Sequence, residues 1–124
     1  MAQVTDLVVD RSHDLRISVV GRADHSAKLR LFGVLDLATR QQLAAAVDKA
    51  LAGGHHQLRL DLARVSFCDG AGIGGIVLAR RAATECDGSL VLTGVPPRLR
   101  KILRMVGIDA LEEQPVPETR TPNF

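Results

Sequence analysis

The residues best placed to do chemistry lie in one glycine-rich stretch, residues 69–75, which reads DGAGIGG. Gly70, Gly72 and Gly75 match the spacing G-x-G-x-x-G, which binds the pyrophosphate of dinucleotides where a strand turns into a helix. Such a site also needs an acidic residue about 20 positions later, at the end of the next strand, to hold a ribose hydroxyl. The segment found there, SLVLTGV from residue 89, contains no carboxylate. A small nucleotide-binding enzyme is therefore a remote alternative.

The same stretch has an interpretation that needs no ligand. Glycines allow a sharp turn and let the following helix pack closely on a sheet, which would account for Gly74 and Gly75. Asp69 stands where a side chain before a helix accepts hydrogen bonds from the free backbone N–H groups of the first turn. An N-cap role for Asp69 and a role in binding are compatible with each other.

The remaining reactive side chains predict neither catalysis nor a metal site. Cys68 and Cys86 match no zinc-binding spacing, and the adjacent His55 and His56 follow two glycines in a connector. A helix between the two cysteines rises about 1.5 Å per residue, whereas the Cα atoms of a disulfide must approach within about 7 Å. Since no nucleophile–base pair or paired carboxylate is visible either, we expect no enzyme activity, no cofactor, no metal and no internal disulfide.

Composition favours one soluble domain that binds neither nucleic acid nor membrane. The 124 residues are 46% hydrophobic and 24% charged, within the range of globular domains. Three Phe and no Trp or Tyr leave few rings on which bases could stack, and a net charge of +2 is weak support for nucleic acid. No apolar stretch is long enough to span a bilayer, and acidic residues near the start argue against a signal peptide. A cytoplasmic location is expected.

Hydrophobic periodicity predicts two strands and a helix in the first half of the chain. Alternation at Leu15, Ile17 and Val19, and again over residues 28–35, indicates an antiparallel pair joined by a polar connector at 22–27. Thr39 and Gln42 have the spacing of a capping box at a helix start. The helical stripe that follows comprises Leu43, Val47, Ala50 and Leu51, and it ends at Gly53-Gly54.

The second half alternates strands with helices. Residues 57–62 predict a strand, and after the glycine-rich turn a helical pattern continues to Asp87-Gly88. Residues 89–93 predict a short strand. A last helix begins at Pro97, with an apolar stripe and a basic, solvent-facing side. The stripe comprises Leu99, Ile102, Leu103 and Val106, and the basic side comprises Arg98, Arg100, Lys101 and Arg104. A short final strand near residues 108–111 is the last expected element.

This order predicts a single α/β domain whose mixed, mostly parallel sheet has four to five strands, with three main helices. We expect an N-terminal extension at residues 1–14, the domain at 15–113, and a disordered tail at 114–124. The tail holds three of the five prolines and few apolar residues.

Two motifs resemble those of a known family. The stretch DLARVSFCDGAGIGGIVLARRAA, residues 61–83, is similar to the signature region of the STAS domain of bacterial anti-sigma factor antagonists. The stretch GVLDLATRQQL, residues 33–43, resembles the upstream family motif, in which a strand ends in Gly-x-Leu-Asp before a helix. The resemblance extends over about residues 15–113 and agrees with the predicted order of elements.

The resemblance implies a protein that regulates transcription by switching partners. Family members bind an anti-sigma factor of the GHKL-type serine kinase class, release a sigma factor, and are inactivated when the kinase phosphorylates a Ser or Thr directly after the position of Asp69. Gly70 and Ala71 stand there, so the usual acceptor hydroxyl is missing. Ser66 belongs to the preceding strand and is not expected to replace it.

The resemblance places Asp36 near the docking surface. The geometry of a strand that runs into a glycine turn predicts partner binding at Asp69, Gly70, Ala71, Gly72 and Ile73, and it predicts a close approach of the partner to the backbone at Gly70, Ala71 and Gly72. For Asp36, a role in docking and a role as a turn residue stay equally open. Arg80 and Arg81 fit a solvated helix face. The alternative function is that of a STAS accessory subunit in a membrane transport ATPase complex, where the domain also lacks an acceptor.

Overall fold

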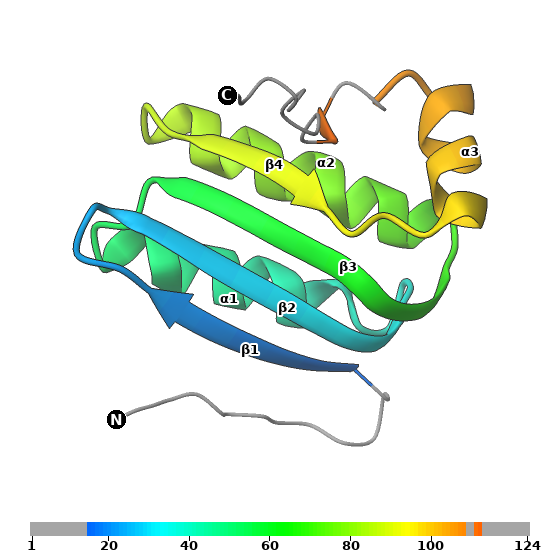
Figure 1. The fold of residues 1–124 in the computed structure, drawn as a ribbon, viewed down its shortest axis with the longest axis horizontal. Helices are drawn as coiled ribbons and strands as arrows, with labels where there is room; N and C mark the ends of the chain where they lie inside the picture. The colour runs from blue at the N-terminus through cyan, green and yellow to red at the C-terminus, as the bar shows by residue number, and fades with distance from the viewer. Residues whose placement is uncertain (1–14, 109–110, 113–124) are drawn as a thin grey trace, which may run out of the picture.

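The computed structural model describes residues 15–108 and 111–112, so the predictions for residues 1–14 and 114–124 lie outside the described residues. Seven elements follow one another (Figure 1). They are β1 (Leu15–Gly21), β2 (Ser26–Leu35), α1 (Arg40–Ala52), β3 (Gln57–Cys68), α2 (Gly70–Glu85), β4 (Ser89–Thr93) and α3 (Pro97–Met105). The predicted α/β order is confirmed, and β3 is longer than predicted, because it continues beyond Leu62 up to the glycine-rich turn.

The four strands form one mixed sheet in the order β1-β2-β3-β4. β1 pairs antiparallel with β2, whereas β2, β3 and β4 run parallel. A fifth strand near residues 108–111 is not formed in the described part of the chain, where Glu112 makes a single bridge to Leu92. The backbone N–H groups of Ile108 and Leu111 donate instead to the carbonyl oxygens of Leu103 and Ile108.

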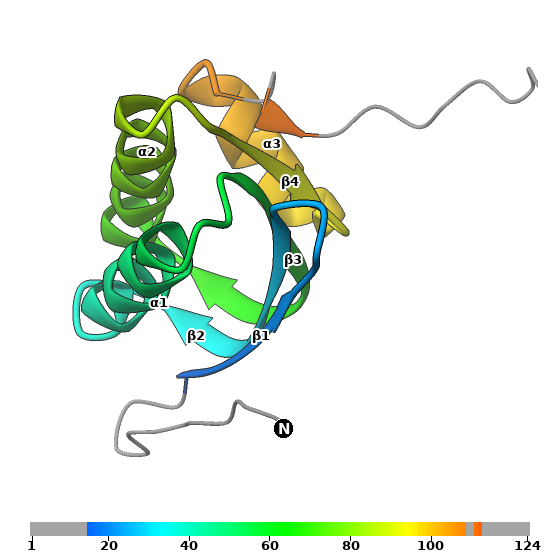
Figure 2. The same cartoon turned by 90° about the vertical axis from the view of Figure 1, so that its left-hand side faces the viewer.

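Among the described residues, helices cover one face of the sheet and no element covers the other. α1 and α2 lie side by side against one face (Figure 2), where alternate strand residues are buried. Leucine supplies most of this core, with Leu29, Leu31, Leu60, Leu62 and Leu92 fully buried. Side chains at the intervening positions point to the uncovered face.

The predicted capping box at the start of α1 is wrong. The hydroxyl of Thr39 is buried and donates to the carbonyl oxygen of Val34 at 2.8 Å, so it does not cap the helix. The side-chain amide of Gln42 donates to the carbonyl oxygen of Leu15 at 3.2 Å. Both side chains therefore tie α1 to the sheet, and a strand carbonyl near the end of β2 competes successfully with the helix N–H groups.

The predicted apolar stripe of α3 is only half buried. Leu99 and Leu103 lie in the core, but Ile102 is 37% exposed and Val106 is 55% exposed, because α3 packs at the end of the sheet and no described element lies beyond it. Arg100 is not a free solvent-facing cation as predicted. It donates from Nη2 and Nε to the carboxylate of Glu112 at 2.7 and 2.9 Å.

Candidate functional site

Two strands end side by side at the edge of the sheet where α1 and α2 begin. Leu35 and Cys68 are register partners in the parallel pair β2–β3. Asp36 and Asp69 directly follow them, so the fold brings together two carboxylates that are 33 positions apart in the sequence. We refer to residues 36 and 69–71 as the strand-end surface.

Asp69 is the N-cap of α2, as predicted. Its Oδ1 accepts a hydrogen bond from the backbone N–H of Gly72 at 2.8 Å, and its carbonyl oxygen accepts from Ile73 at 2.9 Å. In a dinucleotide site, this end of the helix would face the pyrophosphate. Here the carboxylate of Asp69 already accepts a hydrogen bond from this end of α2. The cap disfavours the nucleotide-binding interpretation of the glycine motif.

Asp36 holds the turn between β2 and α1. Its Oδ1 accepts hydrogen bonds from the backbone N–H groups of Ala38 and Thr39 at 3.0 and 3.1 Å. The turn interpretation of Asp36 thus has a direct structural basis. Its side chain is half-buried, so one edge of the carboxylate still faces solvent.

The glycines of the motif are used for packing at two positions and not at the third. A Cβ atom at Gly72 would clash with the carbonyl oxygen of Leu35 and lie 2.8 Å from Cys68 Sγ. A Cβ atom at Gly75 would lie 2.9 Å from the Cβ of Arg40, so this glycine lets α2 approach α1. The prediction that Gly75 lets the helix approach the sheet is wrong. At Gly70 a Cβ atom would meet no other atom within 4 Å.

The predicted binding residues differ in accessibility. Gly70 is exposed, Asp69 and Ala71 are half-buried, and Gly72 and Ile73 are buried. A partner can therefore touch the backbone at Gly70 and Ala71, but the close approach predicted at Gly72 is blocked by the end of β2. The carbonyl oxygen of Ala71 accepts a hydrogen bond from Arg40 Nη1 at 3.4 Å, which links the first turns of α1 and α2.

Cys68, beneath the strand-end surface, is not an activated nucleophile. Burial, together with the nearby charges of Asp69 and Asp36, raises the pKa of its thiol to about 11. The uncharged thiol therefore predominates at neutral pH, whereas nucleophilic cysteines need a lowered pKa. Cys68 and Cys86 are both free and stand at opposite ends of α2.

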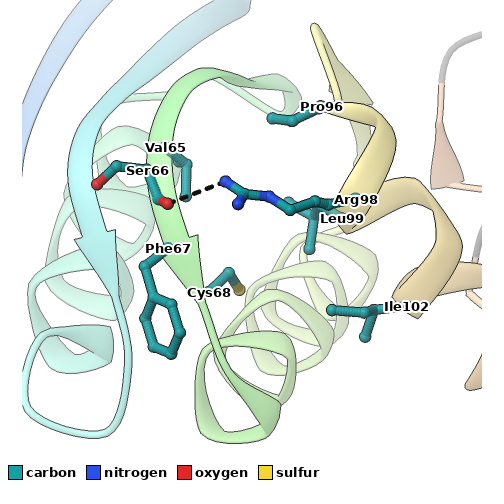
Figure 3. Close-up of a pocket in the computed structure, with 8 residues that line it drawn as sticks. All are labelled: Val65, Ser66, Phe67, Cys68, Pro96, Arg98, Leu99 and Ile102. Atoms are coloured by element: carbon teal, nitrogen blue, oxygen red, sulfur yellow. Dashed lines mark hydrogen bonds between the residues drawn. The ribbon is translucent and has the colours of Figure 1, made fainter.

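An exposed apolar rim next to the strand-end surface was missed in the sequence. Leu37 is 65% exposed and Phe67 is 55% exposed. Beside Phe67 a shallow cavity of about 170 Å³ separates the end of β3 from α3, with Arg98 reaching across it to the carbonyl oxygen of Ser66 at 3.2 Å (Figure 3). The signal was present, since Phe67 occupies an outward position once β3 is extended to Cys68.

Two further findings limit the chemistry of this region. Within residues 15–108 and 111–112, no three His, Cys, Asp or Glu side chains gather in a way that could hold a metal ion. No helix in the same part of the chain is both long enough and apolar enough to cross a bilayer. The strand-end surface and the adjoining apolar rim together offer turn backbone, two carboxylates and two large apolar side chains.

Comparison with known proteins gives a family from the sequence and a matching fold from the structure. A family model described as "Mlab, STAS domain" matches residues 18–113. The anti-sigma F factor antagonist of Lysinibacillus sphaericus is 30% identical over 98 residues, which cover 74% of this chain and 84% of that protein. The unphosphorylated form of the anti-sigma factor antagonist SpoIIAA superposes with a TM-score of 0.69 at 23% identity, covering 83% of this chain and 90% of that one.

The same fold also occurs in a different functional setting. A sulfate transporter family protein from Wolinella succinogenes superposes with a TM-score of 0.63 at 20% identity, covering 74% of this chain and 75% of that one. Since the family match extends over most of the chain and agrees with the strand order and the two motifs, the chain belongs to the STAS domain family, which includes anti-sigma factor antagonists.

Proposed function

We propose that this protein is a cytoplasmic anti-sigma factor antagonist that binds an anti-sigma factor of the GHKL-type serine kinase class and thereby releases a sigma factor. It acts by binding and has no catalytic step of its own. The observation that carries the proposal is the strand-end surface, where Gly70 lies exposed between the N-cap Asp69 and the half-buried Ala71. A partner can contact the backbone directly at Gly70, because this residue has no side chain.

The apolar rim supplies the contact area that the small turn lacks. Leu37 and Phe67 project beside the turn, and neighbouring exposed apolar side chains mark surfaces at which proteins interact, where Phe is enriched. Asp36 and Asp69 sit under this surface and hold its two turns in shape. Their role in binding is therefore to position the backbone as well as to present charge.

Regulation differs from that of phosphorylated relatives in this proposal. A phosphoryl group adds about −1.5 to −2 charge, which at a docking surface repels the partner or blocks its approach. Gly70 and Ala71 have no hydroxyl, so the kinase has no acceptor in this turn. The protein therefore stays competent to bind in the presence of kinase and ATP.

The test uses the GHKL-type anti-sigma kinases of the source organism, purified one by one and mixed with this chain and ATP. We expect a complex with one of them on size-exclusion chromatography and no phosphate on residues 69–72 by mass spectrometry. Gly70→Ser should gain phosphate, because a side chain at this position meets open space. No complex with any kinase, or stoichiometric phosphate on Ser66, would contradict the proposal.

A second candidate is an accessory subunit of a membrane transport ATPase complex. The missing hydroxyl at Gly70 and Ala71 favours it, since a subunit that docks permanently needs no phosphorylation switch. The family description "Mlab" and the related fold of a sulfate transporter family protein are compatible with it. Affinity purification from the native host separates the two candidates, because one recovers a soluble kinase and the other a transporter ATPase.

A further inference from the structure

The sheet face turned away from α1 and α2 carries an unusual concentration of positive charge. We call it the open face (Figure 2). It comprises Arg16, Ser18 and Val20 of β1; Lys28, Arg30 and Phe32 of β2; Arg59, Asp61 and Arg64 of β3; and Val91 and Thr93 of β4. Strand register places these side chains in rows, with Lys28 beside Arg59, Arg30 beside Asp61, and Phe32 beside Arg64.

The charge of the open face exceeds that of the whole chain. Five basic side chains face a single carboxylate, a net charge of +4, whereas the complete sequence has a net charge of +2. The rest of the molecule is therefore net acidic. Such segregation raises the local concentration of anionic partners and speeds their association.

Asp61 is the carboxylate of the open face. Its Oδ2 lies 4.0 Å from Lys28 Nζ and 3.7 Å from Arg30 Nε, so one carboxylate is shared between two cations. Arg16 lies over the ring of Phe32, with its guanidinium carbon 4.9 Å from the ring centroid. This cation–π contact leaves the charge of the guanidinium intact.

The positive surface continues into a hollow at the N-terminal ends of β2, β3 and β4. The hollow has a volume of about 430 Å³, and Arg22, Lys28 and Arg59 contribute to its lining. The carboxylate in it, Asp24, accepts hydrogen bonds from the backbone N–H and the hydroxyl of Ser26 at 3.1 and 2.6 Å. These bonds lower the pKa of Asp24, so its carboxylate stays charged, and the hollow is net basic because its three basic side chains outnumber this one carboxylate.

We propose that the open face is a second docking surface, whose occupant is an extended acidic segment of a protein partner. Lys28 and Arg30 are two residues apart on one strand, which corresponds to about 6.6 Å, the spacing of alternate side chains in an extended peptide. An extended segment with an acidic residue at every second position matches this spacing. Four of the five cations are arginines, whose planar fork pairs with carboxylates through two parallel hydrogen bonds.

Other occupants fit less well. Bases would need aromatic rings to stack on, and the ring of Phe32 is already covered by Arg16. Interfacial membrane binding relies on large apolar side chains next to basic ones, whereas the apolar side chains among the basic rows are two valines and this covered Phe, and the exposed Phe67 lies beyond these rows near the end of β3. The open face also lies on the side of the sheet opposite α2, so an anti-sigma factor at the strand-end surface leaves most of it accessible.

The probe is a fluorescein-labelled 12-residue peptide of alternating Glu and Val, and anisotropy is measured with the full chain at about 20 mM and 200 mM salt. We expect binding at low salt that weakens at high salt, and a loss of at least tenfold in affinity for the double variant Arg30→Glu/Arg64→Glu. The matched control is Arg80→Glu/Arg81→Glu, which makes the same change in charge on the exposed side of α2 and should stay within about twofold of wild type.

Three outcomes would overturn the proposal: equal affinities of the two double variants, tighter binding of a dT12 oligonucleotide, or tighter binding of phosphatidylglycerol vesicles. Circular dichroism checks that both variants are folded. If Arg30→Glu/Arg64→Glu is not folded, NMR titration of the wild type with the peptide replaces the comparison of variants. Peptide-induced shifts must then fall on residues 16–20, 28–32 and 59–64, and shifts confined to residues 69–73 would refute a separate surface. Because the anti-sigma factor takes no part in this assay, its result is independent of the proposed function.

Discussion

Replacing Gly72 with Ala should destabilise the protein, although alanine is normally the better helix former. The added Cβ would clash with the carbonyl oxygen of Leu35 and press on Cys68 Sγ. Leu35 cannot retreat easily, because it is fully buried and lies in register with Cys68 at the end of the β2–β3 pair. Overpacking of this kind costs about 1–3 kcal/mol, which exceeds the gain of about 1 kcal/mol in helix propensity.

Gly70→Ala is the matched comparison, since it makes the same chemical change two positions earlier in the same helix. Its Cβ meets open space, so the free energy of unfolding should stay the same or rise by up to about 1 kcal/mol. Urea denaturation followed by circular dichroism measures both variants. If Gly72→Ala were as stable as Gly70→Ala, the packing of α2 against the end of β2 would be different from that described here.

Three other perturbations test separate parts of the structure. Cys68 should react with a disulfide reagent at pH 8 far more slowly than Cys86, because a rise in thiol pKa from 9.0 to about 11 lowers the thiolate fraction about 100-fold, and equal labelling rates would refute the burial of this thiol. The free energy of unfolding should also fall as the pH rises from 9 toward 11, and this effect should be absent in Cys68→Ala. Thr39→Ala should cost about 1–3 kcal/mol in urea denaturation while Thr39→Ser costs less, because only serine keeps the buried hydroxyl that bonds the strand carbonyl. The hydrogen bond with Arg100 lowers the pKa of Glu112, so the charged carboxylate stabilises the fold above its ordinary pKa of 4.5 and this stabilisation is lost as the pH falls further. Glu112→Gln should therefore reduce the acid sensitivity of thermal unfolding, and an unchanged pH profile would contradict the pairing.

Much of the fold was predictable because its signals are local. Alternation at Leu15 and Ile17 and the helical spacing of Leu43 and Val47 each specify an element whose apolar side must be buried, and all four residues are in the core. Strands separated by helices then require parallel pairing. The N-cap role of Asp69 was predictable for the same reason, since its partner is three residues away.

The errors share a different cause, which is competition from residues far away in the sequence. Gln42 had the spacing of a capping-box residue, but its side chain bonds the carbonyl oxygen of Leu15. Gly75 was assigned to helix–sheet packing and instead accommodates Arg40 of the neighbouring helix. Arg100 was assigned to solvent and instead pairs with Glu112. No local pattern contains these partners, so only the assembled fold identifies them.

The candidate site was predictable in position but not in extent. The motif resemblance identified the turn at residues 69–73. The sequence does not show that a Cβ atom at Gly70 would meet open space, whereas one at Gly72 would clash with the carbonyl oxygen of Leu35. The apolar rim at Leu37 and Phe67 was missed, since it depends on where β3 ends and on the adjacency of two strand ends. The open face requires the strand register, which alternation within single strands does not provide.

The affinity of the anti-sigma kinase for Gly70→Asp tests the central claim most directly, because the added carboxylate enters open space at the strand-end surface and is tolerated at a helix N-terminus. Gly53→Asp is the matched control, an exposed glycine at the opposite end of the strands where a Cβ atom makes only ordinary contacts. By isothermal titration calorimetry we expect Gly70→Asp to bind at least tenfold more weakly than wild type and Gly53→Asp to bind within about twofold of it. Equal affinity of Gly70→Asp and wild type, with both proteins folded, would contradict the assignment of partner binding to this surface.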